Sequence, residues 1–494
     1  MPKPLQQDEV GTAAPRVTCG VMVLCGLLFA SQAALAGTSG AACPSGAVAV
    51  APGTSIQAVI DKAGDGAAFC LKSGVHRVQV VRPRSGQRFY GETGTILNGS
   101  RLVAHFRREG RFWLAQAQLY ASPRHGECLP SAPNCNQPEA LFFDDKPLVR
   151  AASQTTLANG AFYLDYARGL IVVVDDPTGR KVELTVGFFA FESFARDVRI
   201  SNVIVEKYAS VAQKGAVHAR EGVGWHIEDC EVRLNSGSGI DVGTGSVVRN
   251  CDIHHNGQIG IVGNGKGIRI EDNHIWSNNT KGFDPAWEAG GAKIAVSDGV
   301  TFRGNHVHDN NGPGLWCDIE CRNVLYEGNR VENNHDVGIF HEISFDAVIR
   351  NNVLRSNGVG GRGWLWASDI VVAASQDVQV TGNTLTVAAG SCGIVLIDQG
   401  RRAENGREYK TRDNIIRGND MTFAGAPCAG GVSDTKPTDP NFAVIERDNN
   451  RFDGNTYRAP RTNPAGRFVW GHEVTDWEGF RRKGLEPTGR LDLF

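Results

Sequence analysis

Residues 227–232 read IEDCEV, and related six-residue segments follow at six later places in the chain. They are VRNCDI at 248–253, IEDNHI at 270–275, FRGNHV at 302–307, YEGNRV at 326–331, IRNNVL at 349–354 and VTGNTL at 380–385. The fourth letters are Cys230, Cys251, Asn273, Asn305, Asn329, Asn352 and Asn383, spaced by 21, 22, 32, 24, 23 and 31 residues. A unit of about 22 residues with occasional insertions is the period of a solenoid.

Apolar residues alternate within each unit, as in Ile268-Arg269-Ile270, and this is the period of a strand. The Leu-x-x-Leu-x-Leu frame of a leucine-rich repeat is absent. Short strands with Gly and Asn at the corners predict an all-β chain that forms a right-handed parallel β-helix, in which stacked Asn side chains hydrogen-bond along the axis. Cys230 and Cys251 take the Asn position in two successive coils, where either a buried thiol pair or a disulfide would fit.

Changes in composition divide the chain. Residues 45–103 are predicted to hold an N-terminal cap and the first coils, with a capping helix where 54–63 read TSIQAVIDKA. The repeat disappears over 104–190, where aromatic-rich alternating segments predict an inserted small β-sandwich-like domain. The main β-helix is predicted over 191–440, and 441–494 form a C-terminal capping tail.

The first 36 residues have the pattern of a secretory signal peptide. Arg16 precedes an apolar run over 17–30, and residues 34–36 read ALA, a small-x-small cleavage pattern. An uncleaved membrane anchor is the alternative, although the run is short for a span. We expect a secreted or periplasmic protein with no stable membrane insertion after cleavage.

Ten cysteines would remain after cleavage, an even number suited to an oxidising compartment. Proximity suggests four pairs, namely Cys43 with Cys70, Cys128 with Cys135, Cys317 with Cys321, and Cys392 with Cys428. No paired CxxC motifs occur, so no zinc site, other metal or cofactor is predicted. The 51 basic and 53 acidic residues nearly balance, which argues against a nucleic-acid partner.

Aligning the coils brings two carboxylates together. Asp318 lies 13 residues after Asn305, and Glu342 lies 13 residues after Asn329, so both take the same coil position. Parallel strands are about 4.8 Å apart, close to the roughly 5 to 5.5 Å between the carboxyl groups of a retaining glycosidase. The alternative is that both are simply solvated surface charges.

Alternation predicts which side chains in these coils face outwards. Leu315, Cys317 and Ile319 are apolar, and we expect them to point into the core. The same rule places four side chains on the outer face, namely Trp316, Asp318, Phe340 and Glu342.

Neighbouring coils extend this candidate site. Lys293 aligns with Trp316, and the insertion before it carries Trp287 and Glu288. Aromatic rings suit the apolar faces of sugars, and charged groups can hydrogen-bond hydroxyls. A cation beside one of two neighbouring carboxylates favours different protonation states for the two. Strict alternation points the His341 side chain towards the inside of the β-helix. His341 can therefore be interpreted equally well as a core histidine or as a substrate contact.

Two other functions compete with glycoside hydrolysis. A polysaccharide lyase acting on a uronate polymer would use Lys293 or His341 as its base and would need cations to neutralise the uronate. A non-catalytic carbohydrate-binding β-helix could keep the tryptophans and dispense with the carboxylates. In all three cases the expected partner is an oligo- or polysaccharide.

The spacing of Glu288, Lys293, Asp318 and Glu342 on a β-helix with an early inserted sandwich resembles the glycoside hydrolase family 120 β-xylosidases. The resemblance implies that Asp318 is the nucleophile, that Glu342 is the acid/base, and that Glu288 and Lys293 contact substrate. The segments GFDPAWEAGGAK, GPGLWCDI and GIFHEIS are also similar to a broader group of secreted, pectin-lyase-like β-helix proteins.

Overall fold

The computed structural model describes residues 43–360, 363–461 and 466–494. The predicted signal peptide, residues 1–36, lies outside the described residues. Within them, no helix has the length and apolar character needed to cross a membrane.

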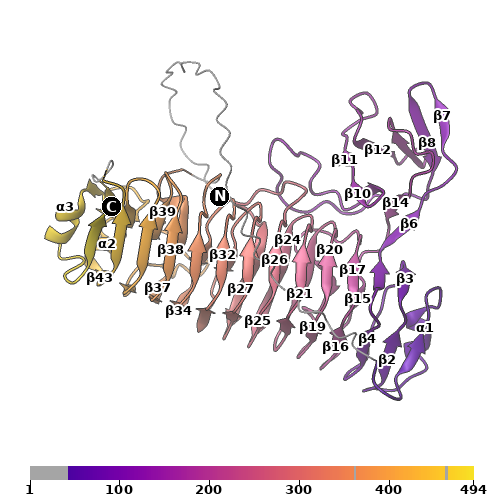
Figure 1. Cartoon of the computed structure of the whole chain (residues 1–494), viewed down its shortest axis with the longest axis horizontal. Coiled ribbons are helices and arrows are strands. Elements are labelled where there is room, and N and C mark those ends of the chain that lie inside the picture. Colours follow the sequence, from indigo (N-terminus) through magenta and orange to yellow (C-terminus); the bar gives the residue numbers. More distant parts are fainter. Residues whose placement is uncertain (1–42, 361–362, 462–465) are drawn as a thin grey trace, which may run out of the picture. The chain divides into compact units, whose positions relative to one another are not determined.

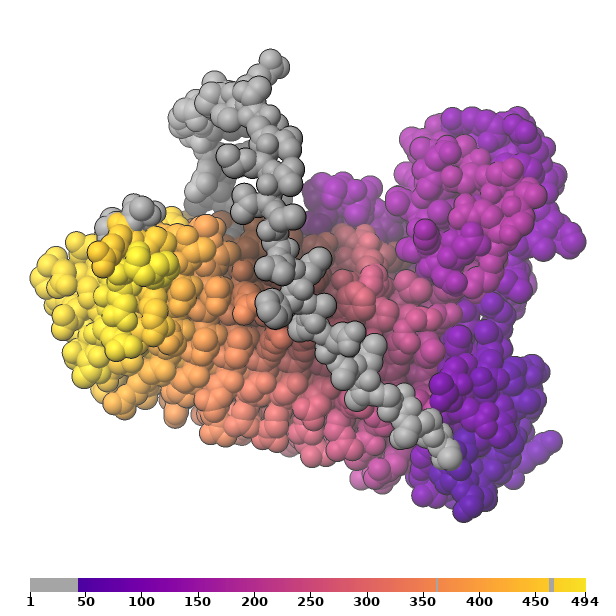
Figure 2. Space-filling model, viewed as in Figure 1, coloured from indigo at the N-terminus to yellow at the C-terminus, as the bar shows by residue number. Residues whose placement is uncertain are grey.

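Three long sheets, here called sheets A, B and C, are built from parallel strands of successive coils (Figure 1). Over residues 199–471, each coil gives one strand to sheet A, one to sheet B and one to sheet C. In Figure 2 the sequence colours therefore follow one another in bands, as each coil stacks on the one before. The parallel β-helix predicted from the repeat is confirmed.

The strands of sheet A are β1 (Val48–Val50), β2 (Ala68–Leu71), β4 (Arg88–Gly91), β16 (Arg199–Ser201), β19 (His226–Glu228), β22 (Val247–Arg249), β25 (Arg269–Glu271), β28 (Thr301–Arg303), β31 (Val324–Glu327), β34 (Phe345–Arg350), β37 (Gln376–Thr381), β40 (Ile415–Arg417) and β43 (Arg451–Asp453). Those of sheet B are β3 (Gly74–Arg77), β5 (Thr95–Asn98), β17 (Ile204–Glu206), β20 (Glu231–Arg233), β23 (Asp252–His254), β26 (His274–Trp276), β29 (His306–His308), β32 (Arg330–Glu332), β35 (Val353–Arg355), β38 (Thr384–Val387), β41 (Asp420–Phe423), β44 (Thr456–Ala459) and β47 (Arg490–Leu493). Those of sheet C are β15 (Phe191–Glu192), β18 (Gly215–His218), β21 (Ser238–Val242), β24 (Ile259–Lys266), β27 (Gly290–Asp298), β30 (Leu315–Asp318), β33 (Ile339–Glu342), β36 (Ser368–Ala373), β39 (Cys392–Asp398), β42 (Cys428–Ser433), β45 (Arg467–Gly471) and β46 (Glu473–Thr475), of which only β46 runs antiparallel to its neighbour.

The six-residue repeat is the corner between sheets A and B. Its first letters form one buried row in sheet A, running from Ile227 through Ile270 to Val380. Its last letters form a second buried row in sheet B, from Val232 to Leu385. The third letter is always Asp, Asn or Gly because that residue has a positive φ in every copy, for example 56° at Asp272 and 64° at Gly304.

The fourth letters form the predicted ladder. Each Asn Nδ2 donates to the Oδ1 of the Asn one coil later, as between Asn305 and Asn329 at 2.9 Å. The ladder runs over Asn273, Asn305, Asn329, Asn352, Asn383, Asn419 and Asn455. Cys230 and Cys251 continue it with free buried thiols, so the thiol alternative holds.

A second ladder, which we did not predict, follows the corner after sheet B. It runs over Asn235, Asn256, Asn278, Asn310, Asn334 and Asn357 and ends on Asp369. These amides satisfy buried backbone carbonyls at a place where the chain leaves the sheets.

Residues 100–185 add two smaller sheets. One contains β10 (Lys146–Pro147), β9 (Leu141–Phe143), β14 (Val182–Thr185) and β6 (Ser100–Leu102), and the other contains β11 (Val149–Arg150), β12 (Ala161–Asp165), β13 (Leu170–Val173), β8 (Phe112–Gln116) and β7 (Arg107–Glu109). Phe143, Leu184, Phe162 and Ile171, two from each sheet, belong to one buried cluster, so the sheets pack face to face. The buried Glu183 of β14 joins them to the coils through Arg77, at 2.8 Å, and through Lys207.

The helices are short. They are α1 (Ile56–Ile60), the 3-10 helix η1 (Trp364–Trp366), α2 (Val444–Arg447) and α3 (Trp477–Arg482). In α1, Ser55 Oγ accepts the Ala58 amide at 3.2 Å, and Ile56 and Ile60 belong to the β-helix core. The domain limits and the capping roles of α1 and the tail stay predictions.

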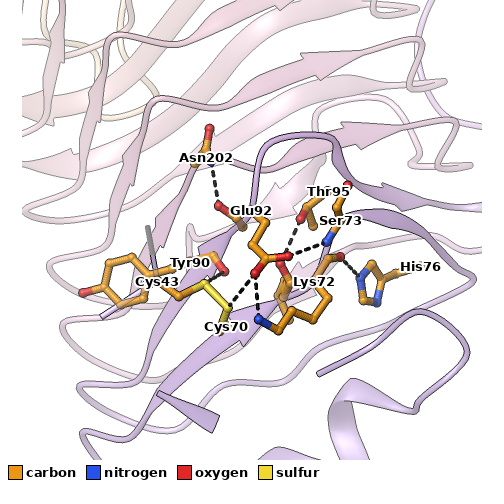
Figure 3. The surroundings of a disulfide bond; sticks show 11 residues. Cys43, Cys70, Lys72, Ser73, His76, Tyr90, Glu92, Thr95 and Asn202 are labelled. Carbon is orange, nitrogen blue, oxygen red and sulfur yellow. Dashed lines mark hydrogen bonds and ion pairs between the residues drawn. A yellow bond between two sulfur atoms is a disulfide. The ribbon is translucent and has the colours of Figure 1, made fainter. Parts of the chain in front are cut away.

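Three predicted disulfides are confirmed, namely Cys43–Cys70, Cys128–Cys135 and Cys392–Cys428. In the first, the side chain of Glu92 lies beside the sulfur atoms and pairs with Lys72 at 2.7 Å (Figure 3). The prediction of a bond between Cys317 and Cys321 is wrong, because both are free and buried. Cys321 turns its thiol towards backbone carbonyls at a coil corner, as Ser344 does with its hydroxyl one coil later.

Candidate active site

Asp318 and Glu342 lie side by side on the outer face of sheet C. β30 and β33 pair in parallel, with Asp318 opposite Glu342 and Trp316 opposite Phe340. One coil earlier, β27 places Lys293 opposite Trp316. This is the register that the coil alignment predicted. Because neighbouring strands are about 4.8 Å apart, the two carboxyl groups start from adjacent positions.

Lys293 is held between two carboxylates. Its Nζ lies 2.9 Å from Asp318 Oδ2 and 3.2 Å from Glu288 Oε2. All three side chains are nearly buried, with residue exposures of 6 to 7%. Burial pulls the pKa of Lys293 down, but the charges of Asp318 and Glu288 outweigh burial and raise that pKa above its usual value. Lys293 is therefore a fixed cation at neutral pH.

Two buried polar atoms next to this cation have no hydrogen-bond partner among the described residues, namely Asp318 Oδ1 and Trp316 Nε1. Buried polar groups are normally paired, so an orphaned acceptor and an orphaned donor on one strand need an explanation. A ligand with both kinds of group, such as a sugar hydroxyl, would satisfy them.

Trp316 differs from the open aromatic platform that we expected. It is only 3% exposed, Lys293 Nζ lies 3.8 Å from its ring centre, and the Phe340 ring stacks on it at 5.2 Å. Trp316, Phe340 and Leu365 of η1 belong to one apolar cluster outside the β-helix core. The ring thus supports Lys293, and its edge carries the unpaired N–H.

Trp287 sits in the insertion before β27, and this insertion packs against the inserted residues 125–137. The Leu129 amide donates to Gly282 O at 3.0 Å, and the Asp284 amide donates to Glu127 O at 3.0 Å. The Trp287 ring contacts His125 edge to face at 5.5 Å. The half-buried Trp287 therefore helps to hold the two segments together beside Glu288.

The sequence did not predict the polar residues that lie next to Glu288 and in the coils before it. Gln213 Nε2 donates to Glu288 Oε2 at 2.8 Å, and His125 Nε2 lies 2.8 Å from Gln213 Oε1. Two coils before Lys293 in the same row, Asp241 pairs with His218 at 2.6 Å and with Arg220 at 2.6 Å. Extending the coil alignment backwards would have found Asp241 and His218, whereas Gln213 and His125 lie in turns without a period.

A cavity of about 680 Å³ lies next to the C-terminal ends of β30 and β33, although neither Asp318 nor Glu342 lines it. Ile319 and Ile343, which directly follow Asp318 and Glu342, line it together with a loop at 401–409. Ile319 is 43% exposed with a φ of 52°, so the expectation that it points into the core is wrong. The strand ends at Asp318, and the alternation ends with it.

His341 lies inside the β-helix and not with the site. It is fully buried, and its Nδ1 lies 3.4 Å from the Tyr326 hydroxyl. Burial lowers the pKa of His341 to about 4, so the ring is neutral at pH 7. The substrate contact predicted for His341 does not fit this position, because strand alternation turns it away from Asp318 and Glu342.

The comparisons with known proteins bear on the fold. A family model described as a right-handed β-helix region matches residues 214–385. The structure of XylC in complex with xylose has a TM-score of 0.60 at 15% identity, covering 82% of this chain and 80% of XylC. The A-module of mannuronan C-5 epimerase AlgE6 from Azotobacter vinelandii has a TM-score of 0.48 at 17% identity, covering 89% of this chain and 94% of the module. No curated protein matches the sequence. The family model and the likeness to XylC identify this chain as a right-handed parallel β-helix protein.

Proposed function

We propose that the protein is a secreted retaining glycoside hydrolase in which Asp318 is the nucleophile and Glu342 is the acid/base. The observation that carries the proposal is the pairing of these two carboxylates on adjacent strands, with Lys293 at 2.9 Å from Asp318. XylC, which has the same fold, was solved with xylose, and this supports a sugar ligand. The three disulfides support the predicted secretion.

In this mechanism Asp318 attacks the anomeric carbon while Glu342 protonates the leaving oxygen, and Glu342 then activates water to release the sugar. Lys293 favours the ionised Asp318 that attack requires. Of the two Asp318 oxygens, Oδ2 faces Lys293 and the buried Oδ1 has no hydrogen-bond partner within the described residues, so we assign the attack to Oδ1. The spacing of adjacent strands predicts that the first product keeps the anomeric configuration.

The test is hydrolysis of a panel of aryl glycosides, aryl β-xylosides among them, by the parent and by Asp318→Asn and Glu342→Gln. We expect both variants to lose roughly 100- to 10,000-fold in kcat on the substrates that the parent cleaves. Glu327→Gln on sheet A is the matched control, since it makes the same change at a carboxylate away from the site. Parent-like rates in Asp318→Asn and Glu342→Gln would disprove the proposal. NMR of the first product tests retention.

A lyase acting on uronate polymers is the second candidate, favoured by Arg401, Arg402 and Arg407 around the cavity. The two bases considered for it are poorly suited. Lys293 is paired with two carboxylates and has a raised pKa, and His341 is buried inside the β-helix. Ultraviolet absorbance from unsaturated products on uronate polymers would favour the lyase. Sugar binding without turnover by the parent would favour a binding module.

A further inference from the structure

The outer face of sheet B carries a group of histidines, on a different sheet from the carboxylate pair of sheet C. β26 and β29 pair in parallel, with His274 opposite His306 and Trp276 opposite His308. The side chains of His274, His306 and His308 are half-buried, and one ring nitrogen from each lies within 4.8 Å of the others. Two neighbouring coils thus bring three imidazoles to one point.

Carboxylates hold the outer nitrogens of two of these rings. Asp309 Oδ2 lies 2.6 Å from His308 Nδ1, and Asp252 Oδ1 lies 3.2 Å from His274 Nδ1. Asp252 Oδ1 also accepts the Trp276 indole N–H at 2.7 Å, so its position is fixed. A carboxylate at Nδ1 favours the tautomer with its proton there, which leaves Nε2 with a lone pair.

The two Nε2 atoms face each other. His274 Nε2 lies 2.7 Å from His308 Nε2. If both Nδ1 atoms carry the protons that the carboxylates favour, two lone pairs meet at this distance, and that arrangement needs a proton or a metal ion between them. Carboxylate, histidine and cation in a row is the arrangement found around metal ions in proteins.

We propose that His274, His306 and His308 bind one divalent transition-metal ion, with water completing the coordination. Three imidazoles and an open position suit Zn²⁺, and Cu²⁺ and Ni²⁺ also prefer imidazole nitrogen. Zn–N bonds of about 2.0 Å in a tetrahedron place the nitrogens about 3.3 Å apart, so the two facing rings need to separate by about 0.6 Å. Half-buried surface side chains can make that change by small rotations.

The surroundings support this assignment. The Trp276 ring lies 5.5 Å from His274 and 5.9 Å from His308, both nearly parallel to it, and so covers one side of the two facing rings. Within the described parts of the chain, one other group of metal-binding residue types lies as close together, namely Cys43, Cys70 and Glu92. Those sulfur atoms are bonded to each other (Figure 3), so they offer no thiolate ligands.

The ion would cross-link two successive coils, because His274 comes from β26 and the other two ligands come from β29. Binding to the folded chain alone raises the unfolding temperature with ion concentration. The proposal is independent of glycoside hydrolysis, and its readouts do not use enzyme activity.

The experiment is calorimetric titration of the full secreted chain, made without a polyhistidine tag and stripped with chelator, using Zn²⁺ alone and then Cu²⁺ alone. We expect one ion per chain, tighter binding of Cu²⁺ than of Zn²⁺, and a higher unfolding temperature in Zn²⁺. The double variant His274→Gln/His308→Gln should bind at least 100-fold more weakly and lose the thermal shift.

His254→Gln is the matched control, because His254 stacks on the same Trp276 at 4.6 Å but lies outside the three ligands. It should bind Zn²⁺ like the parent. Asp309→Asn should weaken binding by roughly 10- to 100-fold while keeping the fold, since it removes only the carboxylate behind His308. Absence of Zn²⁺ and Cu²⁺ binding by the parent would mean that the two rings share a proton and would overturn the proposal. Parent-like affinity in the folded double variant would overturn it as well.

Discussion

At the scale of single residues, the candidate site depends on one cation. Lys293 contacts Glu288, Asp318 and the ring of Trp316, and each of these side chains is nearly buried. Removing one partner of a buried ion pair leaves an uncompensated charge, which costs more than the pair contributes. Here two negative charges would be left together.

Lys293→Met should therefore destabilise the protein at pH 7 by on the order of 3 kcal/mol and also abolish activity. The raised pKa of Lys293 means that its stabilising effect is fully present below the usual lysine pKa and is lost only as the pH rises through the folded-state pKa. Thermal unfolding at pH 7 measures the effect. Lys266→Met, at an exposed lysine of β24, is the control, and equal unfolding temperatures for the two variants would contradict this role.

The sequence was informative for residues that lie inside the repeat. Counting 13 residues from the ladder Asn placed Asp318 beside Glu342, because strands alternate regularly between corners. The burial of Trp316 was not predictable in this way, since Phe340 and Leu365 cover it through contacts outside the period. Gln213 and His125 were missed for the same reason, because turns have no alternation to count.

At the scale of elements, the corners fix the coils. Each ladder Asn accepts from one coil and donates to the next, so one side chain satisfies groups in three coils. Asn329 Nδ2 donates to Phe302 O and Asn352 Oδ1, both at 2.9 Å, and Asn329 Oδ1 accepts from Asn305. In both ladders the Asn follows a residue with a positive φ. Only in the first ladder is that residue always Asp, Asn or Gly, whereas in the second it varies, as with Leu234 and His255, so the second ladder is harder to see in the sequence.

Asn329→Ala should cost about 3 kcal/mol, because it leaves buried partners on both neighbouring coils unpaired. Asn264→Ala, at an exposed position of β24, should change stability by less than about 0.5 kcal/mol. Thermal unfolding followed by circular dichroism compares the two. Similar midpoints would show that the ladder contributes little.

Asp369 ends the second ladder and gives it a pH dependence. Asn357 donates to its Oδ1 at 2.7 Å, its Oδ2 has no partner within the part of the chain that the structure describes, and burial raises the pKa of Asp369 to about 7. The folded state therefore holds this proton more tightly than the unfolded state, so stability is lost as the pH rises from about 4 through 7.

Asp369→Asn removes that loss and continues the ladder with an amide. We expect the variant to be more stable than the parent at pH 8, by on the order of 4 kcal/mol, and to have a similar stability at pH 4.5. Thermal unfolding at the two pH values measures both. Asp377→Asn, an exposed aspartate of β37, should show no such difference between the two pH values. A parent-like midpoint for Asp369→Asn at pH 8 would contradict this account.

At the scale of the whole molecule, the fold was predictable because one short repeat recurs at nearly constant spacing and specifies both a corner and two strands. The cysteines were only partly predictable. Proximity in the sequence predicted three disulfides correctly. It failed for Cys317 and Cys321, because one thiol lies on a strand and the other at a coil corner although the two residues are close in sequence.

The described chain should therefore contain four free thiols, namely Cys230, Cys251, Cys317 and Cys321. All are buried, so an alkylating reagent should modify none of them in the native protein. After unfolding without reductant, mass spectrometry should find these four cysteines alkylated and the other six of residues 43–494 still in disulfides. Alkylation of two residues or fewer would indicate that a further disulfide had formed.

The ladders also give the molecule a direction. Each ladder amide accepts from the preceding Asn and donates one N–H to the Asn of the following coil, so the side-chain carbonyls point towards the N-terminal end and the amide dipoles align. A carboxyl group closes each row at the C-terminal end and accepts the last amide N–H, Glu486 from Asn455 and Asp369 from Asn357. Deleting a middle coil would leave this polarity intact. Removing Glu486 would leave the last amide N–H of an aligned row without its acceptor.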